Sequence, residues 1–168
     1  MRKYIISISC ILTLLNSCNS SNCLKQGSNV GNDMLLTMDH QRYYMNQHKG
    51  QVSVLIFWAT WCTVCKKEMI AFESYKSGLN NEKLNIVAVC INPDEIDKVK
   101  NIVTQLDIHY PILLDEEAKM YERLQTGVVP ITLIVDAKGQ IDETVEGFNE
   151  QILRKMTSRI DLLLENHE

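Results

Sequence analysis

Residues 52–68 have the sequence VSVLIFWATWCTVCKKE, and this stretch decides the fold. Residues 52–58 are β-branched, aromatic or otherwise apolar except for one serine, and so short a run predicts a strand buried on both faces. Beyond Cys62 the apolar residues recur at helical spacing until Gly78, which is expected to end the helix. The sequence therefore places Cys62 at the point where a buried strand leads into a helix.

The rest of the chain alternates between strands and helices. Strands are predicted at residues 84–91, 110–114, 131–135 and 140–145, and helices at 93–106, 117–124 and 148–164. Asn92 is expected to cap the second helix, and Gly139 is expected to turn the chain between two antiparallel strands. Because strand–helix–strand connections favour right-handed parallel crossovers, this order predicts an α/β fold with a central mixed β-sheet flanked by helices.

The segment from Trp58 to Glu68 resembles the active-site segment of the thioredoxin superfamily, most closely that of the extracytoplasmic TlpA/ResA-like thiol–disulfide reductases. Gly127-Val128-Val129-Pro130, just before the predicted hairpin, is similar to the cis-proline loop of that family. A Trp-Cys-x-x-Cys motif joined to a Val-Pro before a strand is far more specific than a bare Cys-x-x-Cys. The resemblance covers about residues 52–168 and implies a thiol–disulfide oxidoreductase with no cofactor beyond a redox-active Cys62–Cys65 disulfide. The thioredoxin-like domain is expected to span residues 34–168.

Cys62 and Cys65 are the predicted catalytic pair. Two cysteines three residues apart at a helix start lie on one face, and the unpaired N–H groups and dipole of that helix end favour a thiolate at Cys62. Cys62 is the expected nucleophile, and Cys65 is expected to resolve the mixed disulfide. Structural zinc is the competing interpretation, but the sequence has no second Cys-x-x-Cys or Cys-His pair to complete four ligands, so no metal is expected.

Glu68 follows Cys65 by one helical turn. In TlpA/ResA-like proteins a glutamate at this motif position is thought to assist proton transfer, so the resemblance implies that a partly buried Glu68 accepts the Cys65 proton. The alternative is a solvated helix charge following Lys66 and Lys67. Cytoplasmic thioredoxins carry a buried Asp in the strand before the motif, where this chain has Ile56, which leaves Glu68 as the local candidate.

Three residues are expected to form the substrate-binding surface. The resemblance implies a cis peptide bond at Pro130, which leaves the backbone N–H and C=O of Val129 to pair with an extended substrate segment. An ordinary trans proline in a turn is the alternative. Trp61 is expected to be a partly exposed wall of this surface, whereas Trp58 is expected to pack in the core.

Residues 1–17 resemble a signal peptide. Two positive charges precede an apolar stretch, residues 4–15, that is shorter than the ~20 residues required to cross a bilayer as a helix. Residues 15–18 resemble the lipobox of bacterial lipoproteins, so Cys18 is the expected lipidation site. Asn16 departs from the small residue usual in that motif, and ordinary secretory cleavage is the alternative.

The polar residues 18–33 are expected to form a lipidated flexible tether. This organisation predicts a membrane-anchored lipoprotein of the cell envelope or periplasm. The expected partners are thiols and disulfides of client proteins, a membrane thiol electron donor, and the membrane itself through the lipid anchor. Nucleic acid is not an expected partner, because acidic and basic residues are mixed along a chain of formal net charge −4 that has no basic block.

The function predicted from the resemblance is reduction of disulfides in exported proteins. Oxidation is the alternative direction, which a very low Cys62 pKa would favour. Two other classes stay open: a copper-binding chaperone with Cys62 and Cys65 as soft ligands, and a lipoprotein that only binds partners. A peroxiredoxin-like peroxidase is disfavoured, because its Pro-x-x-x-Thr-x-x-Cys site is absent and no proline precedes Pro93. Cys90 is expected to be a buried core thiol, and the sequence does not decide the role of Cys23.

Overall fold

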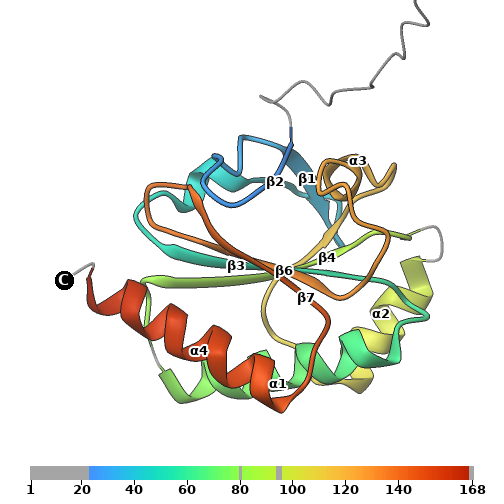
Figure 1. Ribbon diagram of the computed structural model, residues 1–168. Coiled ribbons are helices and arrows are strands. Elements are labelled where there is room, and N and C mark those ends of the chain that lie inside the picture. Colours follow the sequence, from blue (N-terminus) through green and yellow to red (C-terminus); the bar gives the residue numbers. More distant parts are fainter. Residues whose placement is uncertain (1–22, 80, 94–95, 167–168) are drawn as a thin grey trace, which may run out of the picture.

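The computed structural model describes residues 23–79, 81–93 and 96–166, which form a mixed sheet covered by helices (Figure 1). Its strands are β1 (Met34–Thr37), β2 (Arg42–Tyr44), β3 (Val52–Trp58), β4 (Leu84–Cys90), β5 (Ile112–Leu114), β6 (Ile131–Val135) and β7 (Ile141–Glu146). Its helices are the 3₁₀ turn η1 (Met45–His48), α1 (Thr63–Leu79), α2 (Ile96–Gln105), α3 (Lys119–Glu122) and α4 (Glu150–Glu165). The predicted α/β class and mixed sheet are confirmed.

The strand order of the sheet is β2-β1-β5-β4-β3-β6-β7. β3 pairs in parallel with β4 and antiparallel with β6, and β6 and β7 form the predicted hairpin. Every residue of β3 is buried, because alternate side chains point to opposite faces of the sheet and both faces are covered. Ile56 and Trp58 therefore join one hydrophobic core, and Leu55 and Phe57 join the other.

The two cores are closed by different elements. On one face α1, α2 and α4 pack against the sheet through residues such as Phe72, Val99 and Ile160, and Figure 1 shows these three helices together below the sheet. The other face is covered by α3 and by the chain before β1, through Met120 and Leu24. With both faces covered, the central strands are a rigid support for the loops at their ends.

The folded domain begins earlier than the predicted boundary at residue 34. Leu24 and Val30 are buried in the second core, and the Val30 N–H donates to the Gly139 carbonyl at 2.9 Å. The prediction of a flexible tether is therefore wrong for residues 24–33. Most of these residues are polar, but the buried side chains of Leu24 and Val30 attach the segment to the core. The predicted signal peptide and the lipidation site Cys18 lie outside the described residues.

The structure adds detail to two predictions at helix ends. α1 ends at Leu79, one residue beyond the predicted end at Gly78, and the Leu79 side chain packs against the first core. The amide group of Asn92, the predicted cap of the second helix, is hydrogen-bonded to Thr60 across the neighbouring loop, and residues 94 and 95, which such a cap would bind, lie outside the described residues. This contact belongs to the candidate active site described next.

Candidate active site

Three segments of the chain meet at one edge of the sheet to form the site. β3 ends at Trp58, in register with Cys90 at the end of β4, and the chain then passes through residues 59–62 into α1. β6 starts at Ile131, in register with Phe57, directly after the predicted cis-proline loop. Parallel strands end at the same edge of a sheet, and ligands of open α/β sheets bind outside those carboxyl ends. The motif cysteines and Pro130 are therefore brought together by the register of the central strands.

Cys62 and Cys65 form a disulfide at the start of α1, with their Cα atoms 5.3 Å apart. The Cys65 N–H points at the Cys62 sulfur, with 3.1 Å between nitrogen and Sγ, so the helix start already supplies a donor to that sulfur. The two cysteines differ in access, with Cys62 6% exposed and Cys65 0% exposed. An external thiolate can reach only Cys62, which is the order of access that the predicted roles require.

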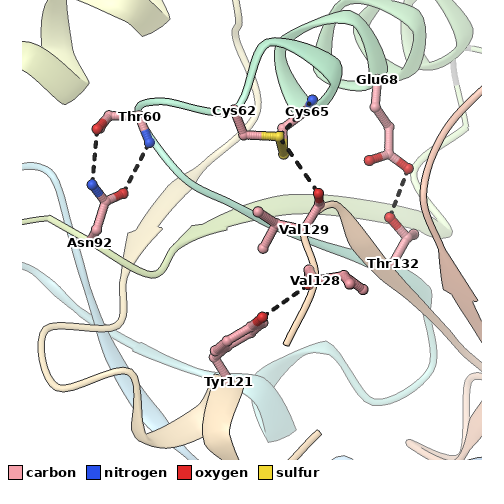
Figure 2. The surroundings of a disulfide bond; sticks show 9 residues. All are labelled: Thr60, Cys62, Cys65, Glu68, Asn92, Tyr121, Val128, Val129 and Thr132. Carbon is pink, nitrogen blue, oxygen red and sulfur yellow. Dashed lines mark hydrogen bonds between the residues drawn. A yellow bond between two sulfur atoms is a disulfide. The ribbon is translucent and has the colours of Figure 1, made fainter. Parts of the chain in front are cut away.

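The Val129–Pro130 peptide bond is cis, as predicted. The Val129 carbonyl oxygen lies 3.8 Å from Cys62 Sγ, so this loop faces the disulfide (Figure 2). Its neighbour Val128 is held by bonds to both of its backbone groups. The Val128 N–H donates to Thr126 Oγ1 at 3.4 Å, and the Val128 carbonyl accepts from the Tyr121 hydroxyl at 2.9 Å.

Glu68 is fully buried, which contradicts the alternative of a solvated helix charge. Its Oε1 accepts a hydrogen bond from the Thr132 hydroxyl at 2.8 Å, and its Oε2 has no hydrogen-bond partner among the described residues. Burial raises the pKa of Glu68 from 4.5 to about 8, and the Thr132 hydrogen bond offsets only part of that rise. Figure 2 shows Glu68 and Cys65 projecting from the same side of α1. A carboxyl group that holds a proton at neutral pH is thus one helical turn from the buried sulfur.

Large apolar side chains lie exposed around the disulfide. Trp61, directly before Cys62, is 67% exposed, and Val64 and Val128 are 44% and 46% exposed. Trp58 is fully buried, as predicted. The exposed residues come from the motif itself and from the cis-proline loop, so apolar surface flanks the reactive sulfur on two segments.

Sequence reasoning missed four residues of the site: Thr60, Asn92, Tyr121 and Thr132. Thr60 and Asn92 bind each other across 32 residues and Thr132 binds Glu68 across 64, whereas Tyr121 binds Val128 seven residues along the chain. No local motif contains both members of a pair. Thr132 had the clearest signal, because side chains two residues apart on a strand share a face, and Thr132 follows Pro130 by two. The predicted site residues Trp61, Cys62, Cys65, Glu68, Val129 and Pro130 do lie together at this edge of the sheet.

Neither a metal centre nor a membrane span is found in the described part of the chain. Over residues 23–79, 81–93 and 96–166, no group of three or more His, Cys, Asp or Glu side chains is arranged to hold a metal ion. Within those same ranges, every helix is too short or too polar to cross a bilayer. Cys90 is a buried thiol, as predicted, and its Sγ lies 3.7 Å from the Asn92 Oδ1 that it donates to.

A disulfide at a helix start, opposite a cis-proline on a mixed sheet, defines a thiol–disulfide oxidoreductase of thioredoxin fold. Residues 29–144 match the AhpC/TSA family, and the chain belongs to that family. Membership in the AhpC/TSA family does not make this chain a peroxidase, because the sequence lacks the Pro-x-x-x-Thr-x-x-Cys site.

Known proteins similar to this chain agree with that class. It is 27% identical over 121 residues to a thiol–disulfide oxidoreductase ResA of Bacillus cereus, covering 72% of this chain and 69% of that protein. Identity to ResA of Bacillus subtilis is 26% over 124 residues, covering 74% and 69% of the two chains. A solved structure of a candidate protein disulfide isomerase from Bacteroides thetaiotaomicron superposes with a TM-score of 0.77 at 21% identity, over 86% of this chain and 96% of that one, which supports the fold.

Proposed function

We propose that this protein is an extracytoplasmic reductase, which passes two electrons from a membrane thiol donor to disulfides of exported client proteins through Cys62 and Cys65. The observation that carries the proposal is the asymmetry of the disulfide. Cys62 reaches the surface beside the cis-proline loop, whereas Cys65 is buried one turn from the protonated carboxyl group of Glu68. The Cys62 sulfur is thus arranged to exchange with partner proteins. The Cys65 sulfur is arranged to leave as a thiolate that Glu68 can protonate.

The first half of the cycle reduces the protein. A donor thiolate attacks Cys62 Sγ, the Cys62–Cys65 bond breaks, and Cys65 leaves as a thiolate. Glu68 then gives its proton to the buried Cys65 sulfur, which would otherwise be a charge without solvent. A second donor thiolate attacks the donor sulfur bound to Cys62, so the donor leaves as a disulfide and Cys62 becomes a thiolate at the helix start.

The second half of the cycle reduces the client. The Cys62 thiolate attacks one sulfur of a client disulfide, and the other client sulfur leaves as a thiolate. Glu68, now a carboxylate, takes the proton of Cys65, and the Cys65 thiolate attacks Cys62 Sγ of the mixed disulfide. The second client thiolate leaves and the Cys62–Cys65 bond forms again. Glu68 therefore ends the cycle with the proton that it held at the start.

Client docking is assigned to the surface beside Cys62. An extended client segment would pair with the backbone of Val129, which the cis bond at Pro130 presents next to the reactive sulfur. The exposed indole of Trp61 would cover an apolar client side chain on the opposite flank. The only cofactor proposed is the Cys62–Cys65 pair itself.

The direction of electron flow is argued from the charge around the sulfurs. A strong oxidant is one whose reduced form is stabilised, usually through its thiolate. In the reduced protein Glu68 has given its proton to Cys65, so its buried carboxylate opposes ionisation of the Cys65 thiol, which disfavours the dithiolate form and lowers the reduction potential. This environment supports a reductant.

Two measurements test the proposal. Equilibration with glutathione should give a reduction potential below the ~−180 mV of a protein disulfide isomerase, and the reduced protein should reduce insulin. A potential above that value, or insulin reduction no faster than the uncatalysed rate, would overturn the reductase assignment. Stoichiometric copper binding without disulfide exchange would instead favour the copper-chaperone class.

We further propose that the protein is anchored to the membrane through a lipid on Cys18. The basic start of the chain, the apolar stretch at residues 4–15 and the lipobox-like residues 15–18 support export and lipidation. Wild-type protein should therefore sediment with membranes, and Cys18→Ser should release it or leave an unprocessed precursor. Soluble wild-type protein with an N-terminus beyond Cys18 would contradict the anchor.

A further inference from the structure

The loop that carries Cys62 is fastened by the side chain of Asn92. Asn92 Oδ1 accepts a hydrogen bond from the Thr60 N–H at 2.9 Å, and Asn92 Nδ2 donates to Thr60 Oγ1 at 2.9 Å. Figure 2 shows these two parallel bonds beside the disulfide. A planar amide that binds one residue through both of its polar atoms fixes that residue in direction as well as in distance.

Thr60 is the residue of the β3–α1 loop that the Asn92 side chain binds. It is buried, it lies midway between the end of β3 at Trp58 and the reactive Cys62, and both its backbone N–H and its hydroxyl are committed to Asn92. The loop has a local turn bond of its own, from the Cys62 N–H to the Ala59 carbonyl at 3.0 Å. That turn bond shapes the loop, whereas the Asn92 bonds attach it to the rest of the protein.

Asn92 is itself fixed by the end of β4. The Ile91 N–H donates to the Trp58 carbonyl at 3.0 Å, which extends the pairing of β3 and β4 to the residue before Asn92. The buried Cys90 thiol also contacts Asn92 Oδ1. The position of Thr60, and through it that of Cys62, is thus set by the central parallel strands and not by the loop alone.

We propose that Asn92 is a positioning residue for the nucleophile, holding Cys62 between the start of α1 and the cis-proline loop. It touches no reacting atom. Its effect is to keep the Cys62 sulfur 3.1 Å from the Cys65 nitrogen and 3.8 Å from the Val129 carbonyl oxygen, the contacts that serve thiolate stability and client docking. The inference rests on the proposed function only in taking Cys62 as the nucleophile.

The test measures the reactivity of the Cys62 thiol in the reduced full-length protein. Iodoacetamide is used as the probe, at a pH below the pKa of this thiol, where the rate follows the thiolate fraction, and the modified cysteine is located by peptide mass mapping. Asn92→Ala should slow modification of Cys62 by a factor of about two to five, the range of a helix-terminus effect on a charge. Its equilibrium with glutathione should shift toward the protein disulfide, because the reduced form loses stabilisation.

Two variants separate positioning from general stability. Asn149→Ala removes a side chain that caps α4 through two bonds of 2.9 Å, to the N–H groups of Gln151 and Ile152 and not to the Cys62 loop, so it should lower the melting temperature without changing Cys62 modification. If Asn92→Ala does not fold, Thr60→Val, which removes only the hydroxyl contact, should show a smaller change in the same direction.

A wild-type rate of Cys62 modification and a wild-type glutathione equilibrium in folded Asn92→Ala would overturn the proposal and leave Asn92 a purely structural residue. The same holds if Asn149→Ala slows modification as much as Asn92→Ala does. The rate of alkylation does not depend on the direction of electron flow or on any client. A failure of the reductase assignment would therefore leave this result interpretable.

Discussion

The two sides of the disulfide are built from opposite kinds of surroundings. On the buried side, Cys65 and Glu68 are fully enclosed, and the Thr132 hydroxyl binds the carboxyl group. On the exposed side, Trp61 and Val128 stand in solvent beside Cys62. We call these the buried side and the exposed side of the site.

The difference shows that burial separates proton transfer from client recognition within one short motif. On the buried side the absence of water raises the pKa of Glu68 to about 8, so a proton is available to one sulfur only. On the exposed side apolar surface near the other sulfur favours contact with a second protein. Proton transfer and client recognition can therefore be changed separately, and the predictions below are ordered by the expected size of the effect.

The largest effect is expected from exchanging the cysteines themselves. Cys62→Ser should abolish exchange and trap no client, because Cys65 is inaccessible to an external disulfide. Cys65→Ser should still attack but should not resolve, so clients should accumulate as mixed disulfides. Non-reducing electrophoresis of both variants in their native compartment checks this. Adducts on Cys62→Ser but none on Cys65→Ser would reverse the assigned roles.

The next effect concerns proton transfer on the buried side. Glu68→Gln keeps the shape and the contact with Thr132 but removes the acid–base group, so resolution by Cys65 should slow by ~10² to 10⁴-fold, the usual contribution of a general base. Because Glu68 acts here as a carboxylate, the wild-type rate of resolution should fall as the pH drops through its pKa of about 8. Stopped-flow measurement across pH should show that this acidic limb is lost in the variant. An unchanged rate and pH profile would remove Glu68 from the mechanism.

Folding stability should report the same buried carboxyl group. The folded-state pKa of Glu68 lies above its ordinary value of 4.5, so between pH 4.5 and about 8 the folded protein holds a proton that the unfolded chain has released. This group therefore lowers stability as the pH rises through that window, by up to about 1.4 kcal/mol per pH unit. Urea unfolding of wild type and Glu68→Gln at several pH values should show this slope in wild type alone. Parallel stability curves would contradict the raised pKa.

Sequence alone was sufficient for the parts of the site that follow from continuous segments. The apolar run at residues 52–58 predicted the central strand, and the motif predicted Cys62 at a helix start. The Val-Pro pair predicted the cis bond at Pro130 through its resemblance to a family loop. Each of these depends on neighbours in the chain, where spacing and propensity apply.

The remainder could not be predicted because it depends on contacts between distant segments. Neighbouring residues predicted Asn92 as a helix cap, but nothing near it in the sequence indicates its bonds to Thr60, 32 residues away. The hydroxyl that binds Glu68 comes from a residue 64 positions along the chain. The short strands β1 and β2 carry too few residues for a clear alternation, and they are defined by pairing, β1 with β5 and β2 with β1. Local patterns do not encode which segments the sheet brings side by side.

The smallest effect is expected on the exposed side, from the Tyr121 hydroxyl that holds the Val128 carbonyl at 2.9 Å. Tyr121→Phe should leave the disulfide chemistry intact but let the cis-proline loop move. KM for a protein client should therefore rise about two- to tenfold, which corresponds to the net free energy of one hydrogen bond. Turnover of a small disulfide, which does not pair with the loop, should stay at the wild-type value. Tyr75→Phe is the matched control, because its hydroxyl binds Asp161 at 2.7 Å on the helical face of the sheet. If Tyr121→Phe impaired reduction of the client and of the small disulfide equally, Tyr121 would act in the disulfide chemistry of the buried side. If neither reaction changed, the cis-proline loop would be held without the Tyr121 hydroxyl.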